Sequence, residues 1–524
     1  MGKRGGLIGL IVGTLLASVG VADAKTFRYA TFADLRTMDP MGLFETFTLA
    51  TQGAVYEGLV RTNRKLEFEP SLATEWSQPS PTVWRFKIRP NVKFHDGSSL
   101  TAEDVVFSFG RAAAEGSDVK PNIATVKEVK KLDDLTVEVI TKEPDPILIN
   151  NLQFLYIMSK TWCEKNGATQ PVDVRKGQEN AATRISNGTG PFVLSGREVG
   201  VKTTFRVNPN WWDKREHNLD EVVYAPIGND ATRVAALLSG EVDMIEPVPV
   251  QDVDRINNTP GRKVLLAPEL RTIFLGMDQA RDELTDSDVK GKNPFKDLRV
   301  RQAFELAIDR EVIKTQVMRG ASRPTALMVG PGINGYDQAL NVPKKADTEA
   351  AKKLLAEAGY PQGFGVGLDC PTDRYVNDER ICLAATAMLA RAGIKVNLNA
   401  QTRAKWFEKI LPRKTSFYML GWTPGTYDVH NALASLMVTP KGPLGTFNLG
   451  GYSNPRFDEL TSLIQVETDK VKRQAMISEA MKIHRDEVGH IALHQQSLAW
   501  GITDNVDLVQ LADNVLKLHW VNIR

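Results

Sequence analysis

The segment YMLGWTPGTYDVHNAL, residues 418–433, brings together side chains that could bind a ligand or do chemistry. It holds an indole, a phenol, a carboxylate and an imidazole, those of Trp422, Tyr427, Asp428 and His430. Two glycines and a proline in the same segment disfavour a continuous helix or strand, so we expect a turn or loop. Loops that carry large aromatic and charged side chains are frequent sites of binding and catalysis. Ligand binding, catalysis and simple packing are the three roles open to this loop.

Catalytic motifs of the common enzyme classes are missing from the sequence. There is no GxSxG, HExxH or CxxC pattern, and GFGVG at 363–367 lacks the spacing of a dinucleotide-binding loop. A hydrolase would need a nucleophile beside a base, and no such pair is recognisable. We therefore expect a protein that is not an enzyme and uses no cofactor, with a hydrolase as the alternative.

The strongest metal-binding candidate is HRDEVGHIALH, residues 484–494. Its candidate ligands are His484, Glu487, His490 and His494. The last two histidines would share a face only if one helix continued through both of them. Gly489 and the following IALH instead predict a turn into a strand, which would separate the histidines. We therefore expect no metal site.

Length and net charge limit the number of domains and the kinds of partner that this chain can have. A chain of 524 residues suggests about two to four domains. The formal net charge is +2, from 65 basic and 63 acidic residues. That near balance argues against a surface that neutralises many phosphates, so we expect no nucleic-acid partner.

The N-terminus, MGKRGGLIGLIVGTLLASVGVADAK, has the pattern of a secretory signal peptide over residues 1–24. Lys3 and Arg4 give a positive start, residues 7–21 are apolar, and Ala-Asp-Ala at 22–24 is a cleavage site between small residues. The apolar run is short for a membrane span of about 20 residues. An uncleaved anchor is the alternative. We expect a mature protein that is monomeric and periplasmic.

Farther along, apolar patterns predict strands and helices in alternation. Strands are expected at 26–32, 84–88 and 135–140. Thr101 has Asp104 three residues on and an apolar run behind it, which is typical of a capped helix start.

The central and later parts of the chain indicate an α/β fold. VVYAPI (222–227), the helical DATRVAALLSG (230–240) and VDMIEPV (242–248) have the order strand, helix, strand. Two later helices end at glycine and lead into GVGLDC (365–370) and IKVNL (394–398). Such alternation implies α/β architecture with a mixed or parallel sheet.

Three cysteines are present, Cys163, Cys370 and Cys382. Export would place them in an oxidising compartment, where a pair can form a disulfide. Cys370 ends a predicted strand and Cys382 lies early in the next helix, which favours this pair. Three unpaired thiols are the alternative.

Seven stretches of the sequence resemble the periplasmic solute-binding proteins of ABC importers for dipeptides, oligopeptides and nickel, the bacterial extracellular solute-binding family 5. They follow the order of that family and cover nearly all of the mature chain. The stretches are YEGLVR (56–61), VKFHDGSSLTAEDVVFSF (92–109), NGTGPF (187–192), DATRVAALLSGEVDM (230–244), PFKDLRVRQAFELAIDRE (294–311), AKKLLAEAGYPQGF (351–364) and YSNPRFDEL (452–460).

The resemblance implies a two-lobed clamp joined by hinge strands, with an extra β-rich domain. The hinge is expected near Leu270 and His494, and a ligand between the lobes would favour the closed state. The implied parts are a discontinuous lobe I at 25–57, 186–268 and 495–524, an extra domain II at 58–185, and lobe III at 269–494.

The resemblance also implies where a ligand is held. Peptide-binding relatives bind the α-amino group with an Asp three residues after a Trp, which here is Trp422, and the matching position is Gly425. Asp428 matches the acid of a following Asp-Pro pair, and His430 replaces another acid. Either a different carboxylate substitutes, with Glu45 in LFETFT as the first candidate, or the ligand is not an ordinary peptide. Glu45 as a solvated loop residue is the alternative.

For the other end of the ligand, Arg374 in CPTDRYVND lies about two residues from the position of a carboxylate-binding Arg in dipeptide-binding relatives. A guanidinium suits a carboxylate, although a surface Arg is equally compatible. Trp422 and Tyr427 could stack on a flat or apolar group. Thr46 and Tyr375 could add neutral hydrogen bonds.

The sequence thus predicts the substrate-binding component of an ABC import system. We expect it to capture a small peptide or peptide-like solute and to deliver it to a permease in the inner membrane. The alternative within binding proteins is a receptor for an opine, a modified amino acid, an aromatic acid or a sugar-like ligand. The alternative from another class is a periplasmic hydrolase.

Overall fold

The computed structural model describes residues 24–442 and 444–524. The predicted signal peptide therefore lies outside the described residues except for Ala24. Over the described ranges, no helix has the length and apolarity that a membrane crossing requires.

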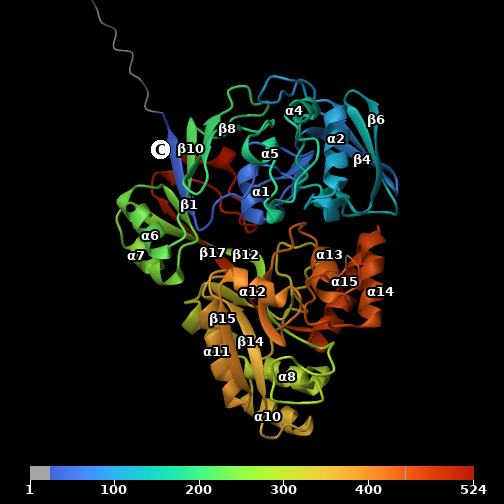
Figure 1. Ribbon diagram of the computed structural model, residues 1–524, viewed down its shortest axis with the longest axis vertical. Helices are drawn as coiled ribbons and strands as arrows, with labels where there is room; N and C mark the ends of the chain where they lie inside the picture. Colours follow the sequence, from blue (N-terminus) through green and yellow to red (C-terminus); the bar gives the residue numbers. More distant parts are fainter. Residues whose placement is uncertain (1–23, 443) are drawn as a thin grey trace, which may run out of the picture.

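The fold is a two-lobed α/β structure organised by one eleven-stranded sheet that runs through both lobes (Figure 1). We use "first lobe" for residues 25–268 and 495–524, and "second lobe" for residues 269–494. The first lobe contributes β1 (Thr26–Thr31), β8 (Phe192–Glu198), β9 (Lys202–Val207), β10 (Glu221–Pro226) and β11 (Met244–Glu246). The second lobe contributes β13 (Ser322–Pro324), β14 (Gly365–Pro371), β15 (Lys395–Gln401) and β16 (Phe417–Trp422).

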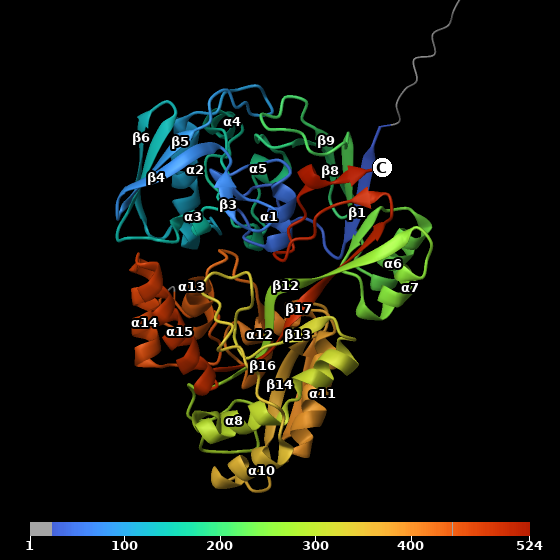
Figure 2. The ribbon, with the colours of Figure 1, turned by 180° about the vertical axis from the view of Figure 1, so that it is seen from behind.

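Two long strands join the lobes, β12 (Arg262–Met277) and β17 (His490–Thr503) (Figure 2). They pair antiparallel on both sides of the crossing, and the register shifts between Pro268 and Thr272. Leu270 lies in that interruption. The irregular part of the ladder thus lies beside the hinge predicted near Leu270 and His494.

The rest of the first lobe is richer in strands at one end. A separate four-stranded sheet there has the order β4-β5-β7-β6 and packs with α2. Its strands are β4 (Ala73–Ser80), β5 (Val83–Ile88), β6 (Val126–Asp133) and β7 (Thr136–Thr141). Two small pairs are β2 (Val60–Thr62) with β3 (Phe68–Pro70), and β18 (Val506–Asp507) with β19 (Asn522–Ile523).

Helices cover both lobes (Figures 1 and 2). The first lobe has α1 (Thr46–Gln52), α2 (Ala102–Ala113), α3 (Leu148–Asn151), α4 (Lys160–Lys165), α5 (Ala181–Arg184), α6 (Asp230–Ser239) and α7 (Val253–Asn257). The second lobe has α8 (Leu298–Ala307), α9 (Arg310–Val312), α10 (Thr348–Glu357), α11 (Asp378–Arg391), α12 (Arg403–Ile410), α13 (Val429–Ala432), α14 (Pro455–Val466) and α15 (Lys470–Asp486).

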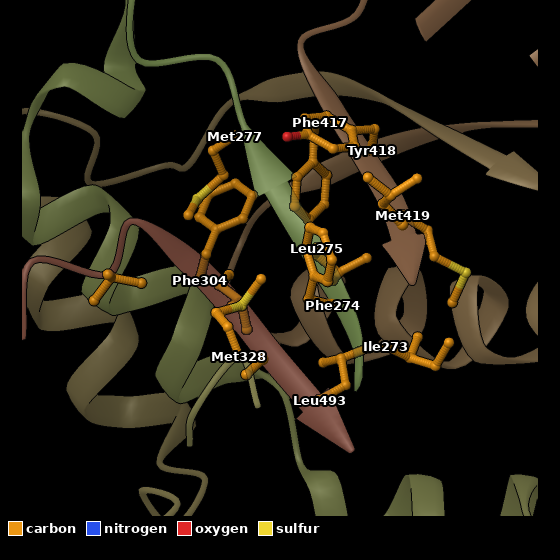
Figure 3. Close-up of a cluster of buried hydrophobic side chains, with 14 of the residues drawn as sticks. Ile273, Phe274, Leu275, Met277, Phe304, Met328, Phe417, Tyr418, Met419 and Leu493 are labelled. Atoms are coloured by element: carbon orange, nitrogen blue, oxygen red, sulfur yellow. The ribbon is translucent and has the colours of Figure 1, made fainter. Parts of the chain in front are cut away.

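The apolar cores indicate which parts of the chain pack as one body. The second lobe has its own core, in which Phe274, Phe304 and Phe417 meet (Figure 3). The first-lobe core is continuous from Phe27 in β1 to Phe86 in β5 of the β-rich sheet. Close-packed interiors transmit displacement rather than absorb it. The β-rich sheet and the first lobe therefore share one core, and the second lobe has another.

The structure confirms the helix start, the helix end and the strand–helix–strand unit that short stretches of the sequence predicted. Thr101 and Asp104 form the capping box that starts α2. α6 ends at Gly240, whose φ of 83° is the left-handed conformation that favours glycine. The strand–helix–strand unit is present as well, with β1 inserted between β10 and β11 and parallel to both.

The favoured cysteine pair is confirmed. The Sγ atoms of Cys370, in β14, and Cys382, in α11, are bonded at 1.94 Å. Cys163 is a free, buried thiol.

Candidate functional site

The candidate site lies where the parallel strands of the two lobes end. β10, β1 and β11 are parallel in the first lobe, and β15, β14 and β16 are parallel in the second. In open α/β sheets, ligands bind outside the carboxyl ends of the strands. Helices α1 and α12, which follow such ends, lie on opposite sides of the junction between the lobes (Figure 1). A solute held there would contact both lobes.

The loop from Thr423 to Asp428 closes this junction from the second lobe. Tyr427 adopts a φ of 55° and buries its ring. Its phenolic oxygen accepts a hydrogen bond from Nε2 of Gln153 at 2.5 Å and donates one to the carboxylate of Asp513. The side chain of Asn150 adds a bond to the carbonyl of Thr426 at 2.8 Å. The loop therefore bridges to the β-rich part and to the C-terminal segment of the first lobe.

Burial raises the pKa of Tyr427 well above its ordinary value, and the negative charge of Asp513 adds to that effect. The phenol therefore stays protonated and remains the donor to Asp513. We expected Tyr427 to stack on a ligand, whereas the structure gives it the environment of a contact between lobes.

Trp422 ends β16 beside this loop. Its indole Nε1 donates to Oδ1 of Asn431 at 2.9 Å, and its ring lies against Phe447 with centroids 4.9 Å apart. The side chain is half-buried, so part of its surface is still accessible. A Cβ atom added at Gly425 would lie 3.5 Å from Cε1 of Phe44 in the first lobe, which is ordinary contact. This end of the loop thus faces the first lobe and has room for a Cβ atom.

Asp428 and His430 lie beneath the loop, inside the second lobe. Asp428 is fully buried, and its two oxygens accept hydrogen bonds from both terminal nitrogens of Arg473 at 2.8 and 2.9 Å. It also accepts one from Nδ2 of Asn334 at 2.6 Å and caps α13 through the amide of His430. Burial lowers the pKa of His430 to about 4, so the imidazole is neutral. This placement differs from the expectation of direct ligand contact, because protein groups already occupy the carboxylate.

Arg374 lies on the loop after β14. The backbone amides of Arg374 and Tyr375 both donate to Oδ2 of Asp378, at 2.8 and 3.0 Å, and fix the loop. The guanidinium carbon lies 5.3 Å from the centre of the Tyr375 ring. Its Nε is buried and has no hydrogen-bond partner among the described residues. Burial lowers the pKa of Arg374, and the cations Arg271 and Arg403 act in the same direction.

The carboxylates near Arg374 are already engaged. Glu45 precedes α1 and lies 3.9 Å from Nη1 of Arg403, which makes an ion pair across the two lobes. It also accepts a hydrogen bond from Thr48 at 3.0 Å. Glu269 pairs with Arg271 at 3.1 Å. The half-buried Arg374 thus has a buried donor without a partner, and an anionic ligand group could supply one.

The remaining predicted contacts form walls of the site. Tyr375 is buried, and its hydroxyl oxygen accepts a hydrogen bond from the amide of Gly421 at 2.9 Å. That bond ties the Arg374 loop to β16. Thr46 is half-buried at the start of α1. The structure therefore brings together Glu45, Thr46 and Arg374 near one junction.

Sequence reasoning missed Arg271 and Arg403. Both lie near elements that were expected, the hinge near Leu270 and the strand predicted at 394–398, which the structure extends to Gln401. A charged pair inside a predicted hinge, such as Glu269 with Arg271, is a signal that could have found the first of them.

His490 and His494 do not share one helix face, which agrees with the turn predicted at Gly489. α15 ends at Asp486 and β17 begins at His490, so His490 and His494 lie on a strand. Nε2 of His484 and Nδ1 of His490 are 2.9 Å apart. Within the ranges that the structure covers, no group of three or more His, Cys, Asp or Glu side chains could hold a metal ion.

Comparison with known proteins gives consistent results. The family described as "Bacterial extracellular solute-binding proteins, family 5 Middle" matches residues 67–442. The glutathione-binding protein GsiB of Escherichia coli (strain K12) is 24% identical over 515 residues, which cover 96% of this chain and 95% of the relative.

Solved structures show the same fold. DppA of Helicobacter pylori, in complex with the peptide STSA, has a TM-score of 0.79 at 22% identity and covers 95% of this chain and 98% of its own. AgaA from A. tumefaciens R10, in complex with agropinic acid, has a TM-score of 0.79 at 23% identity and covers 95% of this chain and 99% of its own.

Proposed function

Because the chain belongs to the family 5 bacterial extracellular solute-binding proteins, we propose that it captures a small peptide or peptide-like solute for an ABC importer. In this proposal it works in the periplasm as a monomer, without catalysis, and delivers the solute to a permease of the inner membrane. The GsiB relatives and the peptide complex of DppA support this solute class.

The observation that carries the proposal is Arg374. It lies beside the junction of the lobes, its side chain is half-buried, and its buried Nε has no partner among the described residues. Arginine and carboxylate form strong, charge-assisted hydrogen bonds. A solute with a carboxylate would complete these bonds and hold the second lobe against the first.

A second candidate is a receptor for an opine-like acid. Gly425 favours it, because the acid expected for the α-amino group of a peptide is absent from this position. AgaA, whose bound ligand is agropinic acid, supports the same class. Both candidates require a carboxylate at Arg374, and they differ in the group at the other end.

The test is binding by calorimetry after the protein is stripped of co-purified solute. We expect wild-type protein to bind at least one of glutathione, Met-Leu and agropinic acid, and Arg374→Ala to weaken that binding about tenfold to a hundredfold. The range follows from about 1.5–3 kcal/mol for a hydrogen bond to a charged group.

The matched control is Arg380→Ala, which removes an exposed guanidinium from α11. We expect it to bind as wild type. Thermal unfolding of both variants shows whether they fold. Folded Arg374→Ala that binds every probe as tightly as wild type would contradict the role of Arg374. Turnover of a peptide by the purified protein would contradict the receptor function itself.

A further inference from the structure

A small recess opens in the first lobe at the carboxyl end of the parallel strands. Its volume is about 20 Å³, enough for one group of the size of a water molecule. Glu246, the last residue of β11, is at its polar end. The other lining residues come from β1, α1 and the C-terminal segment, namely Tyr29, Thr31, Phe47, Ala50, Thr51, Asn514, Leu516 and Leu518.

The carboxylate of Glu246 is only partly satisfied. Its Oε1 accepts a hydrogen bond from Nδ2 of Asn514 at 2.9 Å, and the described residues give it no other. The two cations that act on Glu246 through their charge, Arg233 and Arg271, make their hydrogen bonds to other groups. Arg271 pairs with Glu269, and Arg233 donates to Asp230 and to the carbonyls of residues 227 and 247.

Taken together, the surroundings of Glu246 oppose ionisation of its carboxyl group when no cationic group of a solute is bound. Burial raises its pKa to about 7, the hydrogen bond from Asn514 lowers it, and the charge of Glu269 raises it. Arg233 and Arg271 lower it further. The other titratable groups that interact with it are the hydroxyls of Tyr29 and Tyr224. A bound cation would favour the ionised form.

We propose that Glu246 binds an ammonium group of the solute in this recess, while Arg374 binds a carboxylate of the same solute from the opposite lobe. The inference rests on the proposed function and adds to it the class of solute, a zwitterion with its charges at separate ends.

Size and chemistry both fit an ammonium group. A protonated amine has nearly the volume of a water molecule and three donors. The free oxygen of Glu246 and the hydroxyl oxygens of Thr31 and Thr51 are acceptors around the recess. The rings of Tyr29 and Phe47 offer aromatic surface, which attracts cations. The apolar walls at Leu516 and Leu518 limit water and strengthen the attraction between opposite charges.

The placement of the two charges on different lobes couples solute binding to closure of the clamp. Glu246 belongs to the first lobe and Arg374 to the second. A zwitterion contacts both only when the lobes are together, so its binding free energy favours the closed state. A solute with only one of the two groups would lose that coupling.

The test uses two pairs of probes that differ in one ammonium group. One pair is glutathione and its analogue in which hydrogen replaces the amine. The other is Met-Leu and N-acetyl-Met-Leu. We expect wild-type protein to bind the amine-bearing member of a pair at least tenfold more tightly, and Glu246→Gln to reduce that preference to within about twofold. Glu241→Gln, at an exposed position five residues earlier, should keep the wild-type preference.

The number of protons released on binding distinguishes direct contact of Glu246 with the ammonium from a purely structural role of Glu246. Glu246 is partly protonated at pH 7, so binding of an ammonium should release a fraction of a proton from wild type and none from Glu246→Gln. Calorimetry in phosphate and in Tris detects this release as a difference in heat. Affinity of wild type for the amine-bearing probe should also rise as the pH increases through 7.

The outcomes are distinct. If wild type binds a probe pair and Glu246→Gln keeps the preference for the amine, Glu246 is not the acceptor and the receptor function stands. If wild type binds only members without the amine, the zwitterion class is wrong. If wild type binds none of the four probes, the peptide function fails, and this inference fails with it.

Discussion

At the scale of single residues, Asp428 shows how burial decides between two roles. Its sequence position beside Trp422 and Tyr427 predicts a ligand contact. In the structure, its carboxylate is fully buried and paired with Arg473 through two hydrogen bonds. A buried pair of this kind holds the loop in place from below.

Asp428→Ala should therefore lower stability strongly, because it leaves the guanidinium of Arg473 buried without its partner. Breaking a buried ion pair costs about 3–5 kcal/mol. We expect a clear fall of the midpoint of thermal unfolding, and weaker binding only as far as the loop is disturbed. Glu459→Ala removes one partner of the exposed pair with Arg456 and should leave the midpoint almost unchanged. Equal midpoints for wild type and Asp428→Ala would contradict this assignment.

At the scale of elements, the disulfide restrains the loop that carries Arg374. Cys370 is in β14 and Cys382 is in α11, so the bond closes a ring around residues 371–381. Tyr375 and Asp378 fix the same loop by hydrogen bonds to Gly421 and to the backbone amide of Arg374. The covalent restraint and these bonds together hold the guanidinium at the junction.

The double variant Cys370→Ala, Cys382→Ala should lose this restraint. Closing a loop of this length contributes about 3 kcal/mol when the cross-link restricts the unfolded chain. We expect a lower midpoint of thermal unfolding and weaker binding of carboxylate-bearing probes. Reductant should lower both in wild type and neither in the double variant. A double variant that unfolds and binds as wild type does would show that the bond is dispensable for the loop.

At the scale of the whole molecule, contacts between the lobes set the balance between open and closed states. Tyr427 is central, because its hydroxyl joins the second lobe to Gln153 and Asp513 of the first. The irregular pairing of β12 with β17 near Leu270 is where we expect the lobes to rotate. Because the first lobe and the β-rich sheet share one core, we expect them to move together in such a rotation.

Tyr427→Phe keeps the ring and removes the two hydrogen bonds. We expect the unliganded protein to shift towards the open state, with a larger radius of gyration in solution scattering, and to bind solute a few-fold more weakly. Each bond contributes about 0.5–1.5 kcal/mol, or more to a charged group. Tyr336→Phe removes a hydroxyl that bonds only within the second lobe, to Gln338 and Asn341, and should leave the radius unchanged. An identical radius for Tyr427→Phe and wild type would argue against a latch at this position.

The sequence alone predicted the parts of this protein that depend on near neighbours. The capping box at Thr101, the end of α6 at Gly240 and the pairing of Cys370 with Cys382 all follow from residues within about a dozen positions of one another. The α/β class and the family also follow from such local stretches, read in order along the chain. Arg374 was identified as a candidate carboxylate ligand in the same way.

Only the tertiary structure decided which of the candidate residues face the junction. Asp428 meets Arg473, and Tyr427 meets Gln153 and Asp513, all far apart in sequence. Such contacts depend on the placement of whole strands and helices, and a local pattern carries no information about it. The segment that follows Trp422 thus bridges the lobes through Thr426 and Tyr427, while Glu246 and Arg374, which we propose to bind the solute, lie at or after the ends of other strands.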